Sequence, residues 1–133
     1  MFYVINRIPV KRRARVTKKG YAYVDEKTKA DLKAVRDAYK GKLYHCPVKV
    51  IVIIYKELPK STPKSITSKP YDQRPDCDNV LKACLDGLNG VAFDDDSQVV
   101  EAHVYKRERT RAPGEYCMFA VVPKYLDRKN EYD

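Results

Sequence analysis

The chain has 133 residues, of which 44% are hydrophobic, and a formal net charge of +9 at pH 7. This is the usual length of one domain with its own core, and no apolar run approaches about 20 residues, which excludes a membrane-spanning helix. The first residues place apolar side chains ahead of the charged ones and offer no small-residue cleavage site, so we expect no secretory signal and a cytoplasmic protein.

Charge is divided unevenly along the chain. Residues 1–75 carry 19 Lys and Arg against 6 Asp and Glu, whereas residues 76–133 carry 8 against 12. A basic half beside an acidic cluster favours a protein that holds a polyanion with one region and performs metal-dependent chemistry with another. The alternative is a basic protein with an incidental acidic patch.

The four cysteines do not predict a zinc site. They contain no Cys-x-x-Cys pair, and without a secretory signal disulfides are not expected either. We therefore expect four buried or half-buried thiols, at Cys46, Cys77, Cys84 and Cys117.

The N-terminal third predicts a strand, a basic run and a helix. Residues 2–10 alternate enough for a first strand, and residues 11–19 then contain six Lys or Arg in nine positions. Residues 21–24 form a short extended return. A helix is predicted over residues 28–41, because Thr28 and Asp31 have the spacing of a capping box and Gly41 can end it.

The middle of the chain predicts a central strand and a long loop. Val48–Glu57 is rich in β-branched residues, which indicates a strand buried on both faces. Residues 58–74 follow, with three Pro and four Lys or Arg. A loop of this length in a small domain usually binds something. We therefore expect a mobile basic arm that contacts substrate, with a disordered insertion as the alternative.

The last part predicts a helix over 79–89, strands over 98–107 and 116–122, and a polar tail at 124–133. Strands and helices alternate at first, and then two strands adjoin. This order predicts one α+β domain over residues 1–133, with a mixed sheet of four or five strands and two helices packed against it.

An acidic group flanks the second predicted helix. One face of this helix is apolar and must cover the sheet, with Val80, Leu81, Cys84, Leu85 and Leu88 on it. Asp78 suits an N-cap, but capping leaves Asp76 unexplained. In an extended approach, residues i and i+2 point the same way. Two such carboxylates repel each other unless a hard cation such as Mg²⁺ lies between them.

Three further acids, Asp94, Asp95 and Asp96, stand just before the next strand. We expect this strand entrance to bring one or two of them beside Asp76 and Asp78, around one shared ion. Lys82 lies one turn from Asp78 on the polar face. The alternatives are that the acids are turns and caps, and that Asp78 and Lys82 form an exposed salt bridge worth about 0.3–0.5 kcal/mol.

The stretch "RPDCDNVLKACLDGLNG" followed by "DDDSQVVE" resembles the RusA family of Holliday junction resolvases. The resemblance spans Arg74 to about Glu101 and extends loosely to Pro9–Arg15. It implies a small dimeric endonuclease that needs Mg²⁺, with Mn²⁺ as a substitute, and cuts four-way DNA junctions. By position it implies metal-binding carboxylates at Asp76, Asp78 and Asp96 and a catalytic lysine at Lys82.

Two details depart from the family pattern. The extra acid Asp94 leaves Asp95 able to share the metal with Asp96, whose register is fixed by Gln98. Cys77 stands where the family usually has an aliphatic residue, and we expect it to pack inward. His45 and His103 have no partner in the sequence and are interpreted as packing or surface groups.

The predicted function is Mg²⁺-dependent hydrolysis of a phosphodiester in branched double-stranded DNA by a homodimer, in recombination and repair. Lysines and arginines of the basic run and loop would hold neighbouring phosphates, namely Lys11, Arg12, Arg13, Arg15, Lys18, Lys69 and Arg74. One rival hypothesis is a non-catalytic nucleic-acid-binding protein. Another is a transferase that holds a Mg²⁺–nucleotide, but the chain lacks a Gly-rich phosphate cradle.

Overall fold

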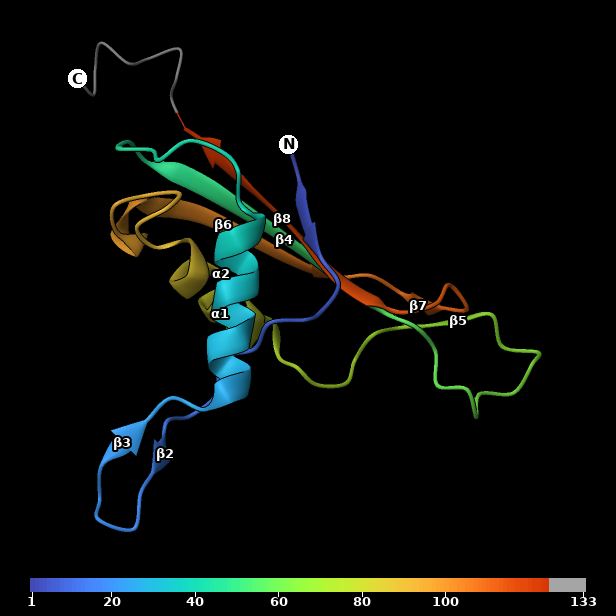
Figure 1. Ribbon diagram of the computed structural model, residues 1–133. Coiled ribbons are helices and arrows are strands. Elements are labelled where there is room, and N and C mark those ends of the chain that lie inside the picture. The colour runs from blue at the N-terminus through green and yellow to red at the C-terminus, as the bar shows by residue number, and fades with distance from the viewer. Residues whose placement is uncertain (125–133) are drawn as a thin grey trace.

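The computed structural model describes residues 1–124, so that the predicted tail falls outside the described residues apart from Lys124. Its centre is a four-stranded mixed sheet in the order β1–β8–β4–β6 (Figure 1). Strand β4 is parallel to β6 and antiparallel to β8, and β8 is antiparallel to β1. The strands are β1 Tyr3–Ile5, β4 Val48–Lys56, β6 Val99–Lys106 and β8 Glu115–Pro123. The predicted α+β class and mixed sheet are confirmed.

Two helices pack together against one face of this sheet (Figure 1): α1 Glu26–Ala38 and α2 Cys77–Leu88. The core lies between them and the sheet, where alternate side chains of β4 are fully buried against Val35 of α1 and Cys84 and Leu88 of α2. The apolar face predicted for α2 is the face that the structure buries.

The second face of β4 is less covered than predicted. Lys49, Ile51 and Ile53 point away from the helices and are half-buried. Because both helices lie on the other side, no helix of the described chain covers this face. The central position of β4 was therefore predicted correctly, whereas its burial on both faces was not.

The capping box predicted for the first helix is wrong. The helix begins one turn earlier, and its N-cap is Asp25, whose carboxylate accepts a hydrogen bond from the backbone N–H of Thr28 at 2.8 Å. Asp31 lies in the helix and is 2% exposed. It holds the N-terminal segment instead, by accepting hydrogen bonds from the side chains of Arg7 (2.9 Å) and Arg12 (2.8 Å) and from the backbone N–H of Val10 (3.2 Å).

The basic run leads into a small hairpin that projects from the body (Figure 1). Its strands, β2 Arg15–Val16 and β3 Ala22–Tyr23, pair in an antiparallel manner, and Gly20 in the turn has φ +88°. A left-handed φ of this kind is accessible to glycine at little cost. The predicted extended return over residues 21–24 is thus one arm of a hairpin.

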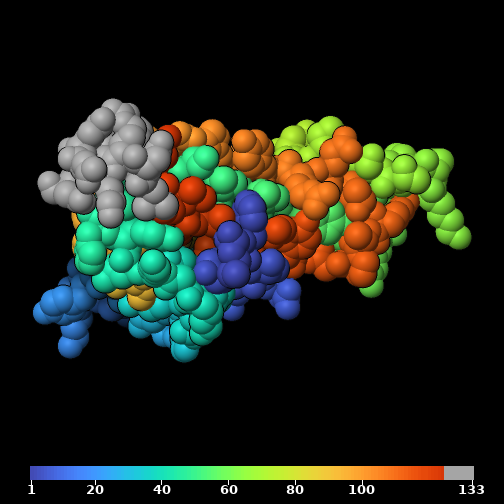
Figure 2. Space-filling view, turned by 90° about the horizontal axis from the view of Figure 1, so that it is seen from above, coloured from blue at the N-terminus to red at the C-terminus, as the bar shows by residue number. Residues whose placement is uncertain are grey.

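The long basic loop forms the lower part of a second projection, here called the tongue, made of residues 57–69 and 107–114 (Figures 1 and 2). Its two short strands, β5 Ser68–Lys69 and β7 Arg109–Thr110, pair in an antiparallel manner. The guanidinium of Arg111 donates to three carbonyls of the loop, those of Thr62, Pro63 and Ile66. The loop therefore has defined turns and attachments, and its mobility stays a prediction.

All four cysteines are free thiols, as predicted. Cys84 and Cys117 are buried and Cys46 is half-buried, but Cys77 is exposed, so the expectation that it packs inward is wrong. Cys77 is the first residue of α2, ahead of the buried positions, which begin at Val80. Neither helix in the described part of the chain has the length and apolar character needed to cross a membrane.

Candidate metal centre and nucleic-acid interface

Two exposed carboxylates stand at the start of α2. Asp76 occupies the N-cap position in extended conformation, yet its side chain accepts no hydrogen bond from the helix. Asp78, which the sequence favoured as the cap, lies within the first turn instead. Negative charge is favourable near a helix N-terminus, but neither carboxylate performs the capping role that would explain it structurally.

Lys82 follows Asp78 by four residues on the exposed side of the same helix. The salt bridge considered between them is not formed, and within residues 1–124 the side chains of Asp76, Asp78 and Lys82 make no hydrogen bond or ion pair. The carboxylates of Asp76 and Asp78 and the ammonium of Lys82, all at the N-terminal half of α2, are thus available to bind a ligand.

The later acidic triplet, here called the acidic loop (residues 94–96), divides into three roles. The Asp94 carboxylate lies 2.7 Å from Nδ1 of His45. The Asp95 carboxylate caps the short 3-10 helix η1, Asp96–Gln98, by accepting from the backbone N–H of Ser97 at 3.0 Å, and hydrogen bonding from Ser97 lowers its pKa. Asp96 is exposed and has no partner among the described residues. Of the three carboxylates, that of Asp96 alone makes no hydrogen bond or ion pair within residues 1–124, and its metal-binding role stays a prediction.

Gln98 holds the acidic loop in place through both the oxygen and the nitrogen of its side-chain amide. Its Oε1 accepts hydrogen bonds from the backbone N–H groups of Asp94 (2.8 Å) and Asp95 (3.0 Å). Its Nε2 donates to the carbonyls of Tyr44 (2.9 Å) and Cys46 (3.0 Å). In the sequence, Gln98 was treated only as a motif position. The capping-box spacing of Asp95 and Gln98 was a local signal for the bonds within the loop, whereas the carbonyls of Tyr44 and Cys46, more than fifty residues away, leave none.

The two acidic groups do not meet within one chain. The 12 residues of α2 span about 18 Å, with Asp76 at the first end, and the chain turns tightly after Leu88 before it reaches the acidic loop. Within the described part of the chain, no group of three or more His, Cys, Asp and Glu side chains is placed to hold a metal ion. The predicted convergence around one ion is therefore absent from the single subunit.

Asp76 and Asp78 nevertheless fit a magnesium ion by the chemistry of their donor atoms. Mg²⁺ keeps several waters and commonly binds through one or two carboxylates together with substrate phosphate. Both carboxylates are exposed and unpartnered in residues 1–124, so they need no rearrangement of other contacts to accept it.

The predicted DNA-binding residues fall into two sets. Lys11 forms an ion pair with Asp86 (2.9 Å), Arg12 with buried Asp31, and Arg15 with Asp25 (3.5 Å). These contacts fix the basic segment to both helices. The other four are exposed and make no ion pair with any residue of 1–124, namely Arg13, Lys18, Lys69 and Arg74.

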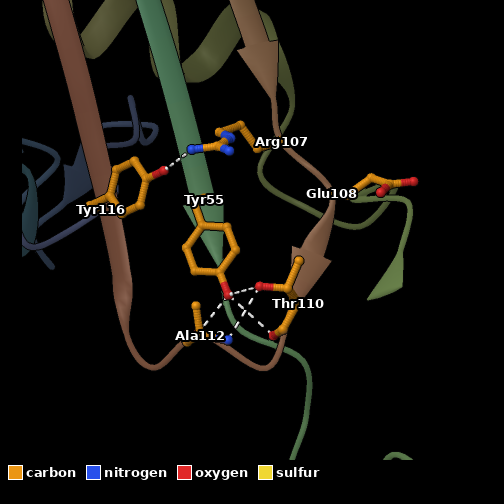
Figure 3. A pocket seen from close by; sticks show the side chains of 6 residues that line it. All are labelled: Tyr55, Arg107, Glu108, Thr110, Ala112 and Tyr116. Atoms are coloured by element: carbon orange, nitrogen blue, oxygen red, sulfur yellow. Dashed lines mark hydrogen bonds between the residues drawn. The ribbon is translucent and has the colours of Figure 1, made fainter. Parts of the chain in front are cut away.

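A small pocket of about 120 Å³ lies at the base of the tongue (Figure 3). The Tyr55 hydroxyl donates to the carbonyl of Ala112 at 2.6 Å, and its ring stacks on Tyr116, whose hydroxyl accepts from Arg107 at 2.7 Å. None of the predicted site residues lines this pocket.

Comparison with known proteins assigns the chain to a family. A family model described as endodeoxyribonuclease RusA matches residues 7–116, which include α2, the acidic loop and most of the sheet. The chain is also 37% identical over 68 residues to an uncharacterized protein, YqaN, of Bacillus subtilis (strain 168). That match covers 45% of this chain and 48% of YqaN, so the chain spans about half the length of this curated relative. By the extent of the family match, the protein belongs to the RusA endodeoxyribonuclease family.

Proposed function

We propose that this protein is a Mg²⁺-dependent endonuclease that resolves four-way DNA junctions in recombination and repair, in the cytoplasm. The observation that carries the proposal is the start of α2, where Asp76, Asp78 and Lys82 have no structural partner among the described residues in a chain of the RusA family. Exposed charged side chains that have no protein partner are free to bind a ligand.

In this proposal Asp76 and Asp78 hold the ion, and Lys82 faces the DNA from the next turn. Mg²⁺, or Mn²⁺ in its place, would polarise the scissile phosphate and acidify the attacking water. The Lys82 ammonium would stabilise the negative charge that grows on the phosphate and the leaving oxygen. Because this charge appears mainly in the transition state, Lys82 contributes to turnover more than to binding.

Neighbouring phosphates would be held by the basic residues that the fold leaves unpaired. Arg13 and Lys18 belong to the projecting hairpin, whereas Lys69 and Arg74 belong to the tongue and to the segment that leads into α2. The two projections lie at opposite ends of the molecule (Figure 1), so they suit different DNA arms. Binding through phosphates should weaken steeply with salt.

We further propose that the active form is a homodimer. A junction with two symmetric cut sites suits a two-fold assembly. Since the acidic loop lies beyond the far end of α2 within one chain, a second copy is the source from which Asp96, with Asp95 beside it, would complete the ligands of an ion held by Asp76 and Asp78.

The proposal is tested by incubating the wild-type protein with a synthetic four-way junction in three reactions: without Mg²⁺, with Mg²⁺, and with Mg²⁺ plus excess EDTA. We expect paired cuts near the branch point only when the metal is present, and no cutting of linear duplex of the same sequence. Metal-independent binding without cleavage would instead support the non-catalytic nucleic-acid-binding protein.

Replacing the lysine of the site tests its assigned role. We expect Lys82→Ala to lower the single-turnover cleavage rate by about 10²–10³-fold, the range for loss of one transition-state donor, with junction affinity changed only slightly. Lys29→Ala, an exposed lysine on α1, is the matched control. An unchanged rate in Lys82→Ala would make Lys82 an ordinary helix-surface residue.

A further inference from the structure

The chain reaches the start of α2 through a short segment that comes from the tongue, here called the approach (residues 71–76). Figure 1 shows it as the yellow-green stretch between β5 and α2. Its first residue, Tyr71, is 6% exposed and belongs to the core, and its last, Asp76, is the N-cap of α2. Residues 72–74 between them are exposed. The position of Asp76 therefore depends on the contacts that other elements make with this exposed stretch.

Arg109 of β7 reaches the approach from the tongue. Its side chain is 9% exposed, a degree of burial that is unusual for arginine. Nη1 donates to Oε1 of Gln73 at 3.0 Å, whereas Nη2 and Nε both donate to the carbonyl of Glu57, at 2.7 and 3.2 Å. One guanidinium thus joins the residue that follows β4, the tongue and the approach.

Lys106, the last residue of β6, holds the same glutamine through its backbone. Its Nζ donates to the carbonyl of Gln73 at 2.7 Å. Gln73 is therefore fixed twice, by Lys106 at its carbonyl and by Arg109 at its side chain. It stands only three residues before Asp76.

Both cations also lie over the ring of Tyr71. Nζ of Lys106 is 5.0 Å from the ring centroid, and the guanidinium carbon of Arg109 is 5.7 Å from it. Cation–π attraction is effective within about 6 Å. The Tyr71 hydroxyl is buried and has no hydrogen-bond partner among the described residues, so the ring is what Tyr71 contributes. We call these four residues the clamp: Tyr71, Gln73, Lys106 and Arg109.

The partners of Arg109 suit a role in geometry better than a role in stability or in DNA binding. They are a carbonyl, an amide oxygen and an aromatic ring, and the guanidinium makes no ion pair within residues 1–124. Because removing a charge from water is costly, a buried guanidinium with neutral partners adds little net stability. Its rigid, planar fork of donors instead fixes the groups that it binds, and its burial keeps it away from phosphates.

We propose that Arg109 is a positioning residue of the metal site. Through Gln73 it holds the approach so that the Asp76 carboxylate stands where it can bind the same ion as Asp78. Mg²⁺ demands near-ideal octahedral geometry at about 2.0–2.1 Å, so a small displacement of Asp76 weakens the joint hold of the two carboxylates. The inference rests on the proposed function for this consequence, and Arg109 itself contacts neither the ion nor DNA.

The positional part is tested on the protein alone, in EDTA, by amide hydrogen exchange followed by NMR. Arg109→Lys keeps the charge and loses the fork of donors. The amides of Asn79 and Val80 donate to the Asp76 carbonyl, at 3.2 Å each. We expect both amides to exchange about tenfold faster in Arg109→Lys through local opening, while the amides of α1 keep their wild-type rates.

The matched control for this experiment is Arg111→Lys. Arg111 also belongs to the tongue, and its guanidinium also donates to carbonyls, but all three of these lie in the tongue and none in the approach. We expect Asn79 and Val80 to exchange at the wild-type rate in this variant. Equal acceleration by Arg109→Lys and Arg111→Lys would show that the tongue as a whole, and not Arg109, sets the position of Asp76.

The catalytic part is measured as the Mg²⁺ concentration that gives half the maximal single-turnover rate on a four-way junction. We expect Arg109→Lys to raise this concentration by about 10–100-fold, the range for groups that orient metal ligands, and to leave junction affinity in EDTA unchanged. An arginine that bound DNA would show the opposite pattern, with weaker junction binding, a smaller salt dependence and the wild-type requirement for Mg²⁺.

Gln73→Ala keeps the test decisive if Arg109→Lys fails to fold, because Gln73 is exposed. We expect it to raise the Mg²⁺ requirement about tenfold, at the lower end of the same range. The double variant should be no worse than Arg109→Lys alone, because both substitutions break one contact and such pairs are not additive. Additive effects would mean that Arg109 does not act through Gln73.

Wild-type exchange of Asn79 and Val80 in both variants, or a wild-type Mg²⁺ requirement in both, would overturn the inference. The exchange experiment uses neither metal nor DNA, so it is independent of cleavage. A wild-type protein that fails to cut junctions would refute the proposed function, even where exchange shows that Arg109 holds the approach. A junction-cutting protein whose exchange and Mg²⁺ requirement ignore Arg109 would refute only the inference.

Discussion

Asp76→Asn should abolish Mg²⁺-dependent cleavage of a four-way junction while leaving binding of that junction intact or tighter. The carboxylate that it removes is exposed, does not cap α2 and forms no ion pair within residues 1–124, so the fold should be unchanged. An amide oxygen carries no net charge and holds Mg²⁺ less well than a carboxylate. We expect turnover to fall by more than about 100-fold, beyond the 10–100-fold typical of residues that only orient metal ligands.

Binding should respond in the opposite direction, because the substitution removes a negative charge that, in the proposed complex, faces DNA phosphates. The measurement is a single-turnover cleavage assay at saturating Mg²⁺, paired with a mobility-shift titration in EDTA. Asp72→Asn makes the same charge change at an exposed position four residues away and should cleave at the wild-type rate. Full cleavage by Asp76→Asn would remove the metal site from the start of α2.

Asp31→Ala should cause the largest loss of stability among single changes of an acidic residue. The Asp31 carboxylate is buried and receives three hydrogen bonds, from the side chains of Arg7 and Arg12 and the backbone of Val10. Breaking a buried pair by removing one partner costs about 3–5 kcal/mol. The two arginines are partly exposed, so water can solvate them, and we expect about 3 kcal/mol.

That loss is a large part of the 5–15 kcal/mol that holds a typical domain together. Urea unfolding followed by circular dichroism measures it, with an unchanged m-value indicating that only stability has changed. The control is Asp37→Ala on the same helix. Its carboxylate is exposed and pairs with Lys33, a contact worth about 1 kcal/mol or less. Equal stabilities of the two variants would show that Asp31 does not anchor the N-terminal segment.

The Asp31 carboxylate shows why the partners of a buried acidic residue cannot be identified from local spacing. The Thr28 and Asp31 pair has the spacing of a capping box, and the cap is Asp25 instead. Asp31 was assigned to capping because of its spacing from Thr28. Its actual partners lie at least 19 residues away along the chain. Hydrogen bonds between distant segments form only when the chain is folded, so no pattern of neighbours predicts them.

Periodic patterns were more reliable, because they depend on the burial of one side of an element. The apolar face of α2 is buried as predicted, and β4 is the central strand. The second face of β4 was misjudged, since an apolar composition does not say how many layers the fold has. The pairing of His45 with Asp94 was also missed, for both residues lie in loops without periodicity.

The sequence by itself determined the mixed α+β class, the amphipathic helix with acids on both sides, and membership of a nuclease family through a motif of local spacing. Only the tertiary structure decided which charges are free. Asp31, Asp94 and Asp95 have protein partners, whereas Asp76, Asp78 and Asp96 have none within residues 1–124. It also separated the two acidic groups by the length of α2 and left β6 as an open edge. The physical reason is that spacing along a chain fixes local geometry, whereas the partners of a side chain and the neighbours of a strand depend on the packing of remote segments.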